Sequence, residues 1–208
     1  MSECSIFAGG VIESLDFIDC DRVRGGLVIC ADRGCEYAEK LGIVPDVIVG
    51  DFDSYSGSLP ENAEILRSVP EKDDTDTMLA VKTAIDRGAD RITLYGALGA
   101  RFDHAFANVQ TLIYAHEYGC EMTIADSDNI ISVQGAGRRS YPLMKDWYFS
   151  IFALSERTEI LSMRGVKYPL ESAVLTSGFP LGVSNDITDR EAVVDVSSGL
   201  LLVVRSKM

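Results

Sequence analysis

Two aspartates one residue apart are the residues of this chain with the clearest chemical meaning. In residues 47–54 (VIVGDFDS), an apolar run leads into a glycine and then into Asp51 and Asp53. Side chains two residues apart in an extended segment point the same way, so both carboxylates can reach one ion. Mg²⁺ prefers such oxygen ligands and completes its shell with water and phosphate oxygens. The pattern indicates a magnesium site; the alternative is a loop that carries aspartate only because aspartate suits turns.

A second acidic cluster lies at residues 72–77 (KDDTDT), where a helical pattern begins. Capping of the helix is one interpretation, but it explains one aspartate better than three. Carboxylates gathered this closely repel one another unless a cation compensates their charge. At the end of the preceding strand, the cluster would lie beside Asp51 and Asp53, which favours a shared cation. Lys72 could assist that site or contact phosphate.

Two further segments follow apolar runs in the same way. One is residues 31–34 (ADRG), which contain Asp32, and the other is the glycine-bearing loop at residues 96–104 (GALGARFDH). That loop leads into a helix N-terminus, where free N–H groups favour an anion, and Arg101 adds a fork that fits phosphate oxygens. It is neither a P-loop nor a GxGxxG fingerprint. His104 is as well suited to capping or stacking as to acid–base work.

The elements that must position these residues alternate between strand and helix up to about residue 125. This alternation predicts a parallel α/β sheet, in which ligands bind at the edge formed by the carboxyl ends of the strands. The four segments that carry the candidate site residues are expected to lie together at that edge. The predicted strands are residues 5–8, 27–31, 47–50, 65–69, 91–95 and 122–125. The predicted helices are residues 35–41, a helix capped by Asp73 that ends at Gly88, and a helix capped by Asp103 that ends at Gly119.

After Asp126 the pattern changes to short apolar or alternating runs broken by Gly, Pro, Ser and Asn. No helical pattern is evident there, which predicts an antiparallel β-sandwich of roughly 80 residues. The predicted strands are residues 130–133, 148–154, 173–175, 192–196 and 200–204. The predicted fold is thus an N-terminal parallel-sheet α/β nucleotide-binding domain, residues 1–127, followed by a C-terminal antiparallel β-sandwich, residues 128–208.

Composition excludes several function classes. The formal net charge of −13 argues against binding to nucleic acid or to an anionic membrane surface. A small phosphorylated ligand remains compatible, provided that a divalent cation masks the repulsion. No apolar run approaches the roughly 20 residues that cross a bilayer, and no secretory signal is evident. The five cysteines show no CxxC spacing, so they are expected to be reduced in a cytoplasmic protein.

In order and spacing, these segments resemble the motifs of the thiamine pyrophosphokinases. The resemblance covers nearly the whole chain and is most specific in its first four motifs. It rests on residues 31–34 (ADRG), 50–54 (GDFDS), 72–76 (KDDTD), 96–104 (GALGARFDH), Asn108, 126–131 (DSDNII), 165–170 (GVKYPL) and 183–185 (VSN). Arg33 and Ala100 stand where many relatives have glycine, and an arginine at position 33 is able to add a phosphate contact.

The resemblance implies that the chain transfers a diphosphate group from ATP to the hydroxyethyl oxygen of thiamine, giving thiamine diphosphate and AMP. It implies an ATP- and Mg²⁺-binding catalytic domain, a thiamine-binding β-sandwich, and a homodimer with thiamine held at the junction between subunits. The implied Mg²⁺ ligands are Asp32, Asp51, Asp53 and Asp76. The residues expected to act in catalysis are Asp76, Asp51 and Arg101. The residues expected to bind nucleotide or thiamine are Arg33, Lys72, Asp73, Thr75, Arg101, Asp103, His104, Tyr168, Ser184 and Asn185.

Two other functions fit part of the pattern. An apolar strand followed by Asp-x-Asp also opens the motif of phosphohydrolases that use the first aspartate, here Asp51, as a nucleophile. The later lysine and acidic pair of that chemistry are not convincingly placed, and residues 96–104 would have no role in it. A module that senses nucleotide or thiamine without turnover is the second alternative. The density of metal-competent carboxylates favours the enzyme, and the proton acceptor is open between Asp76 and a neighbouring carboxylate.

Overall fold

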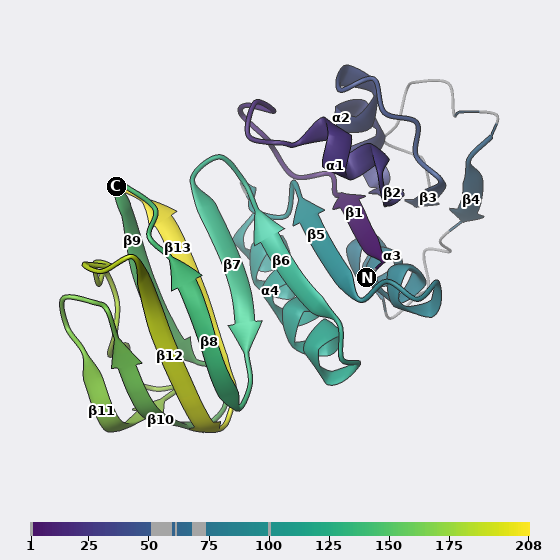
Figure 1. Cartoon of the computed structure of the whole chain (residues 1–208). Coiled ribbons are helices and arrows are strands. Elements are labelled where there is room, and N and C mark those ends of the chain that lie inside the picture. The colour runs from purple at the N-terminus through teal and green to yellow at the C-terminus, as the bar shows by residue number, and fades with distance from the viewer. Residues whose placement is uncertain (1, 51–59, 61, 68–73, 100) are drawn as a thin grey trace. The chain divides into compact units, whose positions relative to one another are not determined.

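The structure is a computed structural model that describes residues 2–50, 60, 62–67, 74–99 and 101–208 (Figure 1). The described chain divides into two compact units, Met1–Ser127 and Asp128–Met208. The first unit mixes helices with parallel strands, and the second contains antiparallel strands. None of the described helices is both long enough and apolar enough to cross a bilayer.

Six parallel strands form the sheet of the first unit, in the order β4-β3-β2-β1-β5-β6. Their central members are almost entirely buried, as expected for a parallel sheet with both faces covered. The strands are β1 Glu3–Phe7, β2 Leu27–Ala31, β3 Val47–Gly50, β4 Glu64–Arg67, β5 Arg91–Tyr95 and β6 Glu121–Ala125. All six predicted strands are therefore present, with bounds that shift by a residue or two.

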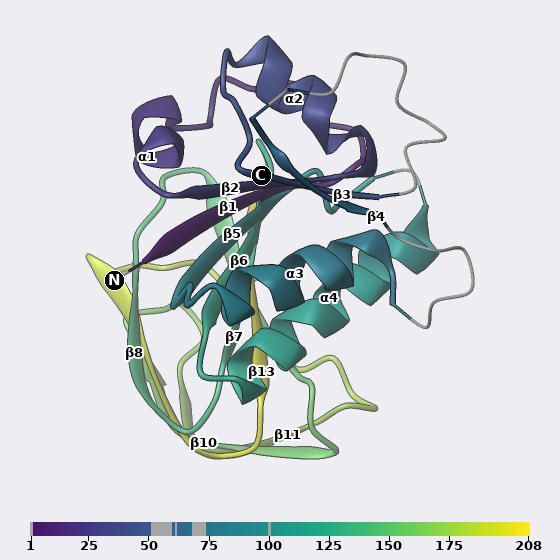
Figure 2. The same cartoon turned by 90° about the vertical axis from the view of Figure 1, so that its right-hand side faces the viewer.

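Helices cover both faces of this sheet: α1 and α2 lie on one face, and α3 and α4 lie on the other (Figure 2). The helices are α1 Cys20–Arg24, α2 Cys35–Lys40, α3 Asp76–Asp86 and α4 Phe102–Glu117. Gly42, Gly88 and Gly119 follow the last three with positive φ, which suits glycine at a helix end.

The predicted helix caps are wrong at both of the acidic positions chosen. Thr75 is the N-cap of α3, and its hydroxyl accepts a hydrogen bond from Met78 N at 3.1 Å. Asp73, the predicted cap, lies outside the described residues. Arg101 occupies the N-cap position of α4 and makes no side-chain capping bond, while Asp103 lies within the first turn. Threonine competes well as a cap because its short side chain reaches the free N–H groups.

The second unit contains two antiparallel groups of strands, in the orders β7-β13-β9 and β11-β10-β12-β8. Buried side chains from both groups form one apolar core, which includes Phe149, Ile151, Met163 and Val194. Its strands are β7 Asn129–Gln134, β8 Gly137–Pro142, β9 Trp147–Ala153, β10 Arg157–Arg164, β11 Leu170–Thr176, β12 Glu191–Ser198 and β13 Leu201–Lys207. The five predicted strands are present, and β8 and β10 were not predicted.

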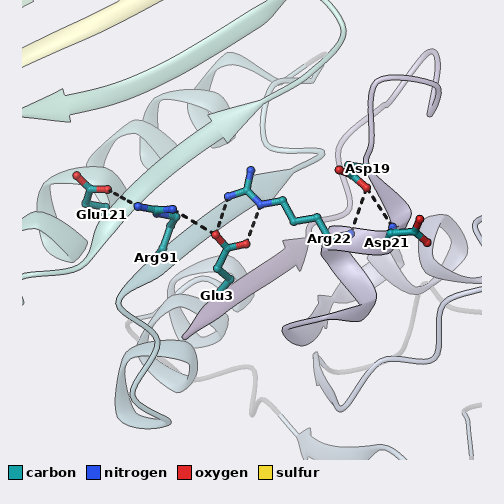
Figure 3. Close-up of polar contacts among 6 residues, drawn as sticks. All are labelled: Glu3, Asp19, Asp21, Arg22, Arg91 and Glu121. Atoms are coloured by element: carbon teal, nitrogen blue, oxygen red, sulfur yellow. Dashed lines mark hydrogen bonds and ion pairs between the residues drawn. The ribbon is translucent and has the colours of Figure 1, made fainter. Parts of the chain in front are cut away.

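A chain of ion pairs ties together the amino ends of three strands in the first unit (Figure 3). Glu3 of β1 accepts hydrogen bonds from Arg22 of α1 at 2.7 and 3.1 Å and from Arg91 of β5 at 3.3 Å. Arg91 also pairs with Glu121 of β6 at 3.5 Å. These contacts lie at the edge of the sheet opposite to the carboxyl ends, so they stabilise the scaffold away from the predicted site.

Candidate active site

A cavity of about 430 Å³ is lined by residues that follow β1, β2 and β5 at the carboxyl edge of the parallel sheet. The chain leaves β1 in one direction through β2, β3 and β4, and then returns to place β5 on the other side of β1. Such a switch point is where open α/β sheets bind their ligands. Of the predicted site residues, Asp32, Arg33, Arg101 and His104 line this cavity. The cavity is of the size, about 300–1,000 Å³, that small-molecule sites usually have.

Asp32 is held in an unusual backbone conformation at the end of β2. Its φ is +51°, a value rare for a residue other than glycine. A Cβ added to Gly50 would lie 3.2 Å from Asp32 Oδ1, and one added to Gly9 would lie 3.4 Å from Asp32 Cβ. The two glycines therefore leave room for the carboxylate, which faces the end of β3. Asp51 follows there, and a hard cation such as Mg²⁺ suits this oxygen donor.

The floor of the cavity is made by two loops that cross at glycine. Gly10 N donates a hydrogen bond to Gly96 O at 2.9 Å. A Cβ on Gly10 would lie 2.3 Å from Gly96 O, and one on Gly96 would lie 2.5 Å from Ala8 O. No larger residue fits either position without a backbone shift, and Gly96 also has a φ of +66°.

The loop that follows β1 is anchored from α2 by Tyr37. The Tyr37 hydroxyl donates to Gly10 O at 2.7 Å and accepts from Ile12 N at 3.1 Å. One side chain thus satisfies two backbone groups of the loop that carries Gly9, Gly10 and Val11 along the cavity. Buried amide and carbonyl groups need such partners, so Tyr37 fixes the path of this loop.

Arg101 and Asp103 form a close ion pair at the start of α4. Arg101 donates to Asp103 at 2.6 and 3.2 Å, and this hydrogen-bonded pairing lowers the pKa of the Asp103 carboxyl. Asp103 also accepts a hydrogen bond from His104 N at 3.0 Å. The Asp103 carboxylate therefore orients the Arg101 guanidinium at the cavity rim. Both side chains remain largely exposed.

Arg33 lies on the cavity wall one residue after Asp32 and is oriented in the same manner. It donates hydrogen bonds to Glu36 at 3.1 and 3.3 Å. On the opposite side, buried Asn108 of α4 donates to Ala97 O at 2.8 Å and so ties the glycine-bearing loop to the helix. The cavity therefore combines one carboxylate, two arginines and a backbone floor, an arrangement suited to a polyphosphate with a bound cation.

The start of α3 brings part of the second acidic cluster to this region. Thr77 lines the cavity, and it follows Thr75 and Asp76 directly. Asp74 turns to Lys82 of the same helix, which donates to both carboxylate oxygens at 2.6 and 2.8 Å. Asp51, Asp53, Lys72 and Asp73 lie outside the described residues. Within the described chain, no group of three acidic, histidine or cysteine side chains is placed to hold a metal.

The three predicted thiamine-site residues lie together in the second unit. The Asn185 side chain is buried, donates to Tyr168 O at 2.9 Å and accepts from Tyr168 N at 3.0 Å. Ser184 has a φ of +55°, and its N–H donates to Ser150 Oγ at 2.9 Å. Asn185 therefore latches the backbone of Tyr168, whose ring remains exposed. Among the described residues, the adjacent Asp186 has one buried carboxylate oxygen without a hydrogen-bond partner.

Sequence reasoning did not predict the cavity residues Gly9, Gly10 and Val11, nor Tyr37 behind them. The glycine pair at the end of the first apolar run was visible, but it matches no phosphate-binding motif. The glycine pair lines the cavity only because β5 lies beside β1 in the sheet. The order of strands and helices along the chain does not specify that neighbour. A search for glycines after the strands that flank a switch point would have found it.

The comparisons with known proteins agree with this geometry. The family model described as "Thiamin pyrophosphokinase, catalytic domain" matches residues 24–124, and "Thiamin pyrophosphokinase, vitamin B1 binding domain" matches residues 139–201. A thiamine pyrophosphokinase of Bacillus subtilis is 30% identical over 99% of both chains. Thiamin pyrophosphokinase 1 of Caenorhabditis elegans is 26% identical over 76% of this chain and 68% of its own.

Solved structures give the same result. The crystal structure of the Bacillus subtilis thiamine pyrophosphokinase has a TM-score of 0.89 at 27% identity and covers all of both chains. That of a family protein from Enterococcus faecalis has a TM-score of 0.86 at 27% identity, also over all of both chains. With sequence, architecture and cavity in agreement, this chain belongs to the thiamine pyrophosphokinase family.

Proposed function

We propose that this chain is an ATP-dependent thiamine diphosphokinase, which transfers a diphosphate group from ATP to thiamine and releases AMP. The observation that carries the proposal is the cavity at the β1/β5 switch point, where Asp32, Arg33 and Arg101 meet in a member of this family. A cavity with an acidic and a basic wall suits a nucleotide polyphosphate that is accompanied by a cation. The first unit is accordingly the nucleotide-binding catalytic domain.

The polyphosphate would lie against the backbone floor formed by Gly10 and Gly96, where the two loops pack directly on each other because neither position carries a Cβ. Arg101 and Arg33 would contact its oxygens, and their carboxylate partners Asp103 and Glu36 hold the guanidinium groups in place beforehand. Such preorganisation is the main contribution of a protein to phosphoryl transfer, in which it does little covalent chemistry.

Mg²⁺ fits the oxygen donors that would surround it, namely Asp32 and Asp76 of the described chain together with Asp51 and Asp53. Bound there, the ion would offset the negative charge of the phosphate oxygens. The Asp32 carboxylate faces the end of β3, which supports its membership of this group. Lys72, Asp73 and Thr75 would lie nearby as nucleotide-binding residues, on the strength of the family motif.

The chemical step is an in-line displacement at the β-phosphorus of ATP. The hydroxyethyl oxygen of thiamine forms a bond to that phosphorus as the bond to the oxygen bridging the α- and β-phosphates breaks, and AMP leaves with that oxygen. The hydroxyl proton passes to a carboxylate, for which Asp76 and its neighbours are candidates. Holding the two substrates in line provides much of the acceleration.

The second unit would be a β-sandwich that holds thiamine near Tyr168, Ser184 and Asn185. The formal net charge of −13 suits the approach of a cationic substrate. Exposed apolar side chains at Phe179, Leu181 and Val183 support a homodimer with thiamine at its junction. All five cysteines carry free thiols, in keeping with a cytoplasmic protein.

Mass spectrometry of the products formed from ATP, Mg²⁺ and thiamine tests the function directly. Thiamine diphosphate and AMP in equal amounts are expected. Release of inorganic phosphate without thiamine diphosphate would instead identify a phosphohydrolase, and binding of both ligands without AMP would identify a sensing module. Either of these results would contradict the proposal.

A further inference from the structure

An ion pair between Asp74 and Lys82 stands at the entrance to α3. Lys82 Nζ lies 2.6 and 2.8 Å from the two carboxylate oxygens of Asp74, so it engages both of them. About a third of each side chain is exposed, 34% for Lys82 and 32% for Asp74. The pair is thus more enclosed than the Arg101–Asp103 pair at the cavity rim, whose side chains are 70% and 65% exposed.

The spacing of this pair shows what it does to the chain. Residues eight apart in a continuous helix are separated by about 12 Å along the axis. The contact closes because the helix begins only at Asp76, after the extended N-cap Thr75, whose ψ is 155°. Asp74 therefore lies back along the side of α3, where Lys82 holds it. This contact fixes the direction from which the chain enters the helix.

Lys82 is itself held from the neighbouring helix. Its Nζ lies 5.7 Å from the centroid of the Tyr114 ring on α4, within the range of a cation–π contact. Tyr114 in turn stacks on Tyr118, with ring centroids 4.5 Å apart. The same helix begins beside Arg101. A single line of contacts therefore connects the acidic segment before α3 with the helix that follows the glycine-bearing loop.

We propose that Lys82 is a positioning residue for diphosphate transfer: by holding Asp74 back along α3, it sets the first turn of that helix, in which Thr77 lines the cavity and Thr75 and Asp76 directly precede it. Lys82 engages both Asp74 oxygens and compensates their charge, which gives Asp74 a structural partner and leaves Asp76 as the carboxylate of this turn that is proposed to bind the metal. The acidic cluster is thereby divided into a structural carboxylate and functional ones. This inference rests on the proposed function.

An ordinary surface ion pair would have a different consequence. Exposed pairs contribute little to stability, and breaking one leaves a distant active site unchanged. A positioning pair instead changes the response of the enzyme to its metal. The discriminating measurements are therefore the Mg²⁺ concentration that gives half-maximal AMP formation at saturating ATP and thiamine, and the Kd of Mg²⁺ measured by calorimetry in the presence of a non-hydrolysable ATP analogue.

The test uses K82M, D74A, the double variant K82M/D74A and the conservative variant K82R in the full chain. Each single variant is expected to raise the half-maximal Mg²⁺ concentration about 10-fold, in the range seen when groups behind a metal ligand are lost. The increase in the double variant should equal that of either single variant, because each substitution removes the same contact. It should not be the product of the two single increases. K82R should stay close to wild type.

Arg87 offers a matched control, because it pairs with Glu64 at the opposite end of α3. R87M should lower the unfolding temperature and leave the Mg²⁺ response unchanged. Wild-type Mg²⁺ dependence in K82M, or a double variant about 100-fold weaker, would overturn the positioning role. If K82M does not fold, D74A alone decides between the same outcomes. A wild-type chain that forms no AMP overturns the proposed function as well.

Discussion

Arg101 and Asp103 illustrate how single residues prepare the cavity before a nucleotide arrives. The hydrogen bonds from Arg101 lower the pKa of the Asp103 carboxyl below its ordinary value, as expected for a carboxylate paired with a guanidinium. Asp103 keeps the guanidinium oriented at the cavity rim at little entropic cost, since a planar fork loses little freedom for each bond formed. Asp103 thus pairs with Arg101, rather than acting as the helix cap that its position in the sequence indicates.

Replacing Arg101 with alanine is expected to weaken the use of ATP far more than the use of thiamine. Loss of hydrogen bonds from a charged donor to phosphate should raise the KM for ATP about 10- to 100-fold. Steady-state kinetics with each substrate varied in turn will measure this. D103N, which removes the charge that orients Arg101, should raise the KM for ATP by a smaller factor. An unchanged KM and kcat for ATP in R101A would remove Arg101 from the site.

Tyr37 acts on the cavity from behind the loop it anchors. In Y37F, Gly10 O and Ile12 N lose their shared partner. Each lost hydrogen bond costs about 1 kcal/mol, so the KM for ATP is expected to rise about 5- to 10-fold as the loop loosens. Y148F, which alters an exposed tyrosine of β9 in the second unit, is the control. Equal ATP kinetics in Y37F and wild type would contradict this role.

At the scale of elements, α3 depends on its cap. The Thr75 hydroxyl accepts from Met78 N, and T75A leaves that N–H without an intrahelical partner. We expect T75A to lower the free energy of unfolding by about 1 kcal/mol, while T75S retains most of the stability. Urea unfolding measures both. Equal losses in the two variants would show that the hydroxyl is not the stabilising group.

The elements that sequence reasoning found are those with a strong apolar pattern. The buried runs of β2 and β3 were predicted with correct bounds. The missed helix α1 has five residues and buries only Val23, which is too little to give a helical period. The missed strand β8 (GRRSYP) buries only Tyr141. In the missed strand β10, the pairing with β12 shifts in register, which interrupts the alternation of buried and exposed side chains. These elements are defined by their neighbours in space.

The residues of the candidate site were predictable where charged side chains directly follow an apolar strand in the sequence. Asp32, Arg33, Arg101 and His104 line one cavity because parallel strands bring their carboxyl ends together. The role of Asp74 was not predictable, since a carboxylate that binds a lysine eight residues away looks the same in sequence as one that binds a metal. Contacts of this kind depend on how the chain enters a helix, which its residue types do not specify.

At the scale of the whole molecule, the ion pairs at the amino edge predict a pH-dependent stability. Hydrogen bonds from Arg22 and Arg91 lower the pKa of Glu3 below its ordinary value of 4.5. A lowered folded-state pKa stabilises the protein fully above the unfolded pKa, and this contribution is lost as the pH falls through the folded value. E3Q should therefore lower the unfolding temperature at pH 7 and lose this effect progressively below about pH 4.5.

Thermal unfolding of wild type and E3Q between pH 7 and pH 3 will measure the effect. E13Q is the control, because Glu13 is exposed and the structure describes no ion pair for it. AMP formation at pH 7 should be equal in E3Q and wild type, since Glu3 lies at the edge opposite to the cavity. A constant difference in unfolding temperature across the whole pH range would contradict the role given to the Glu3 charge.

The crossing of Gly10 and Gly96 constrains any redesign of nucleotide selectivity. Since neither position admits a Cβ, these two positions contribute peptide groups and no side chain to the cavity. Mutational libraries aimed at these two glycines would mostly yield inactive protein. Acceptance of another triphosphate would have to come from Val11 and the other side chains around the rim, where variation leaves the peptide floor intact.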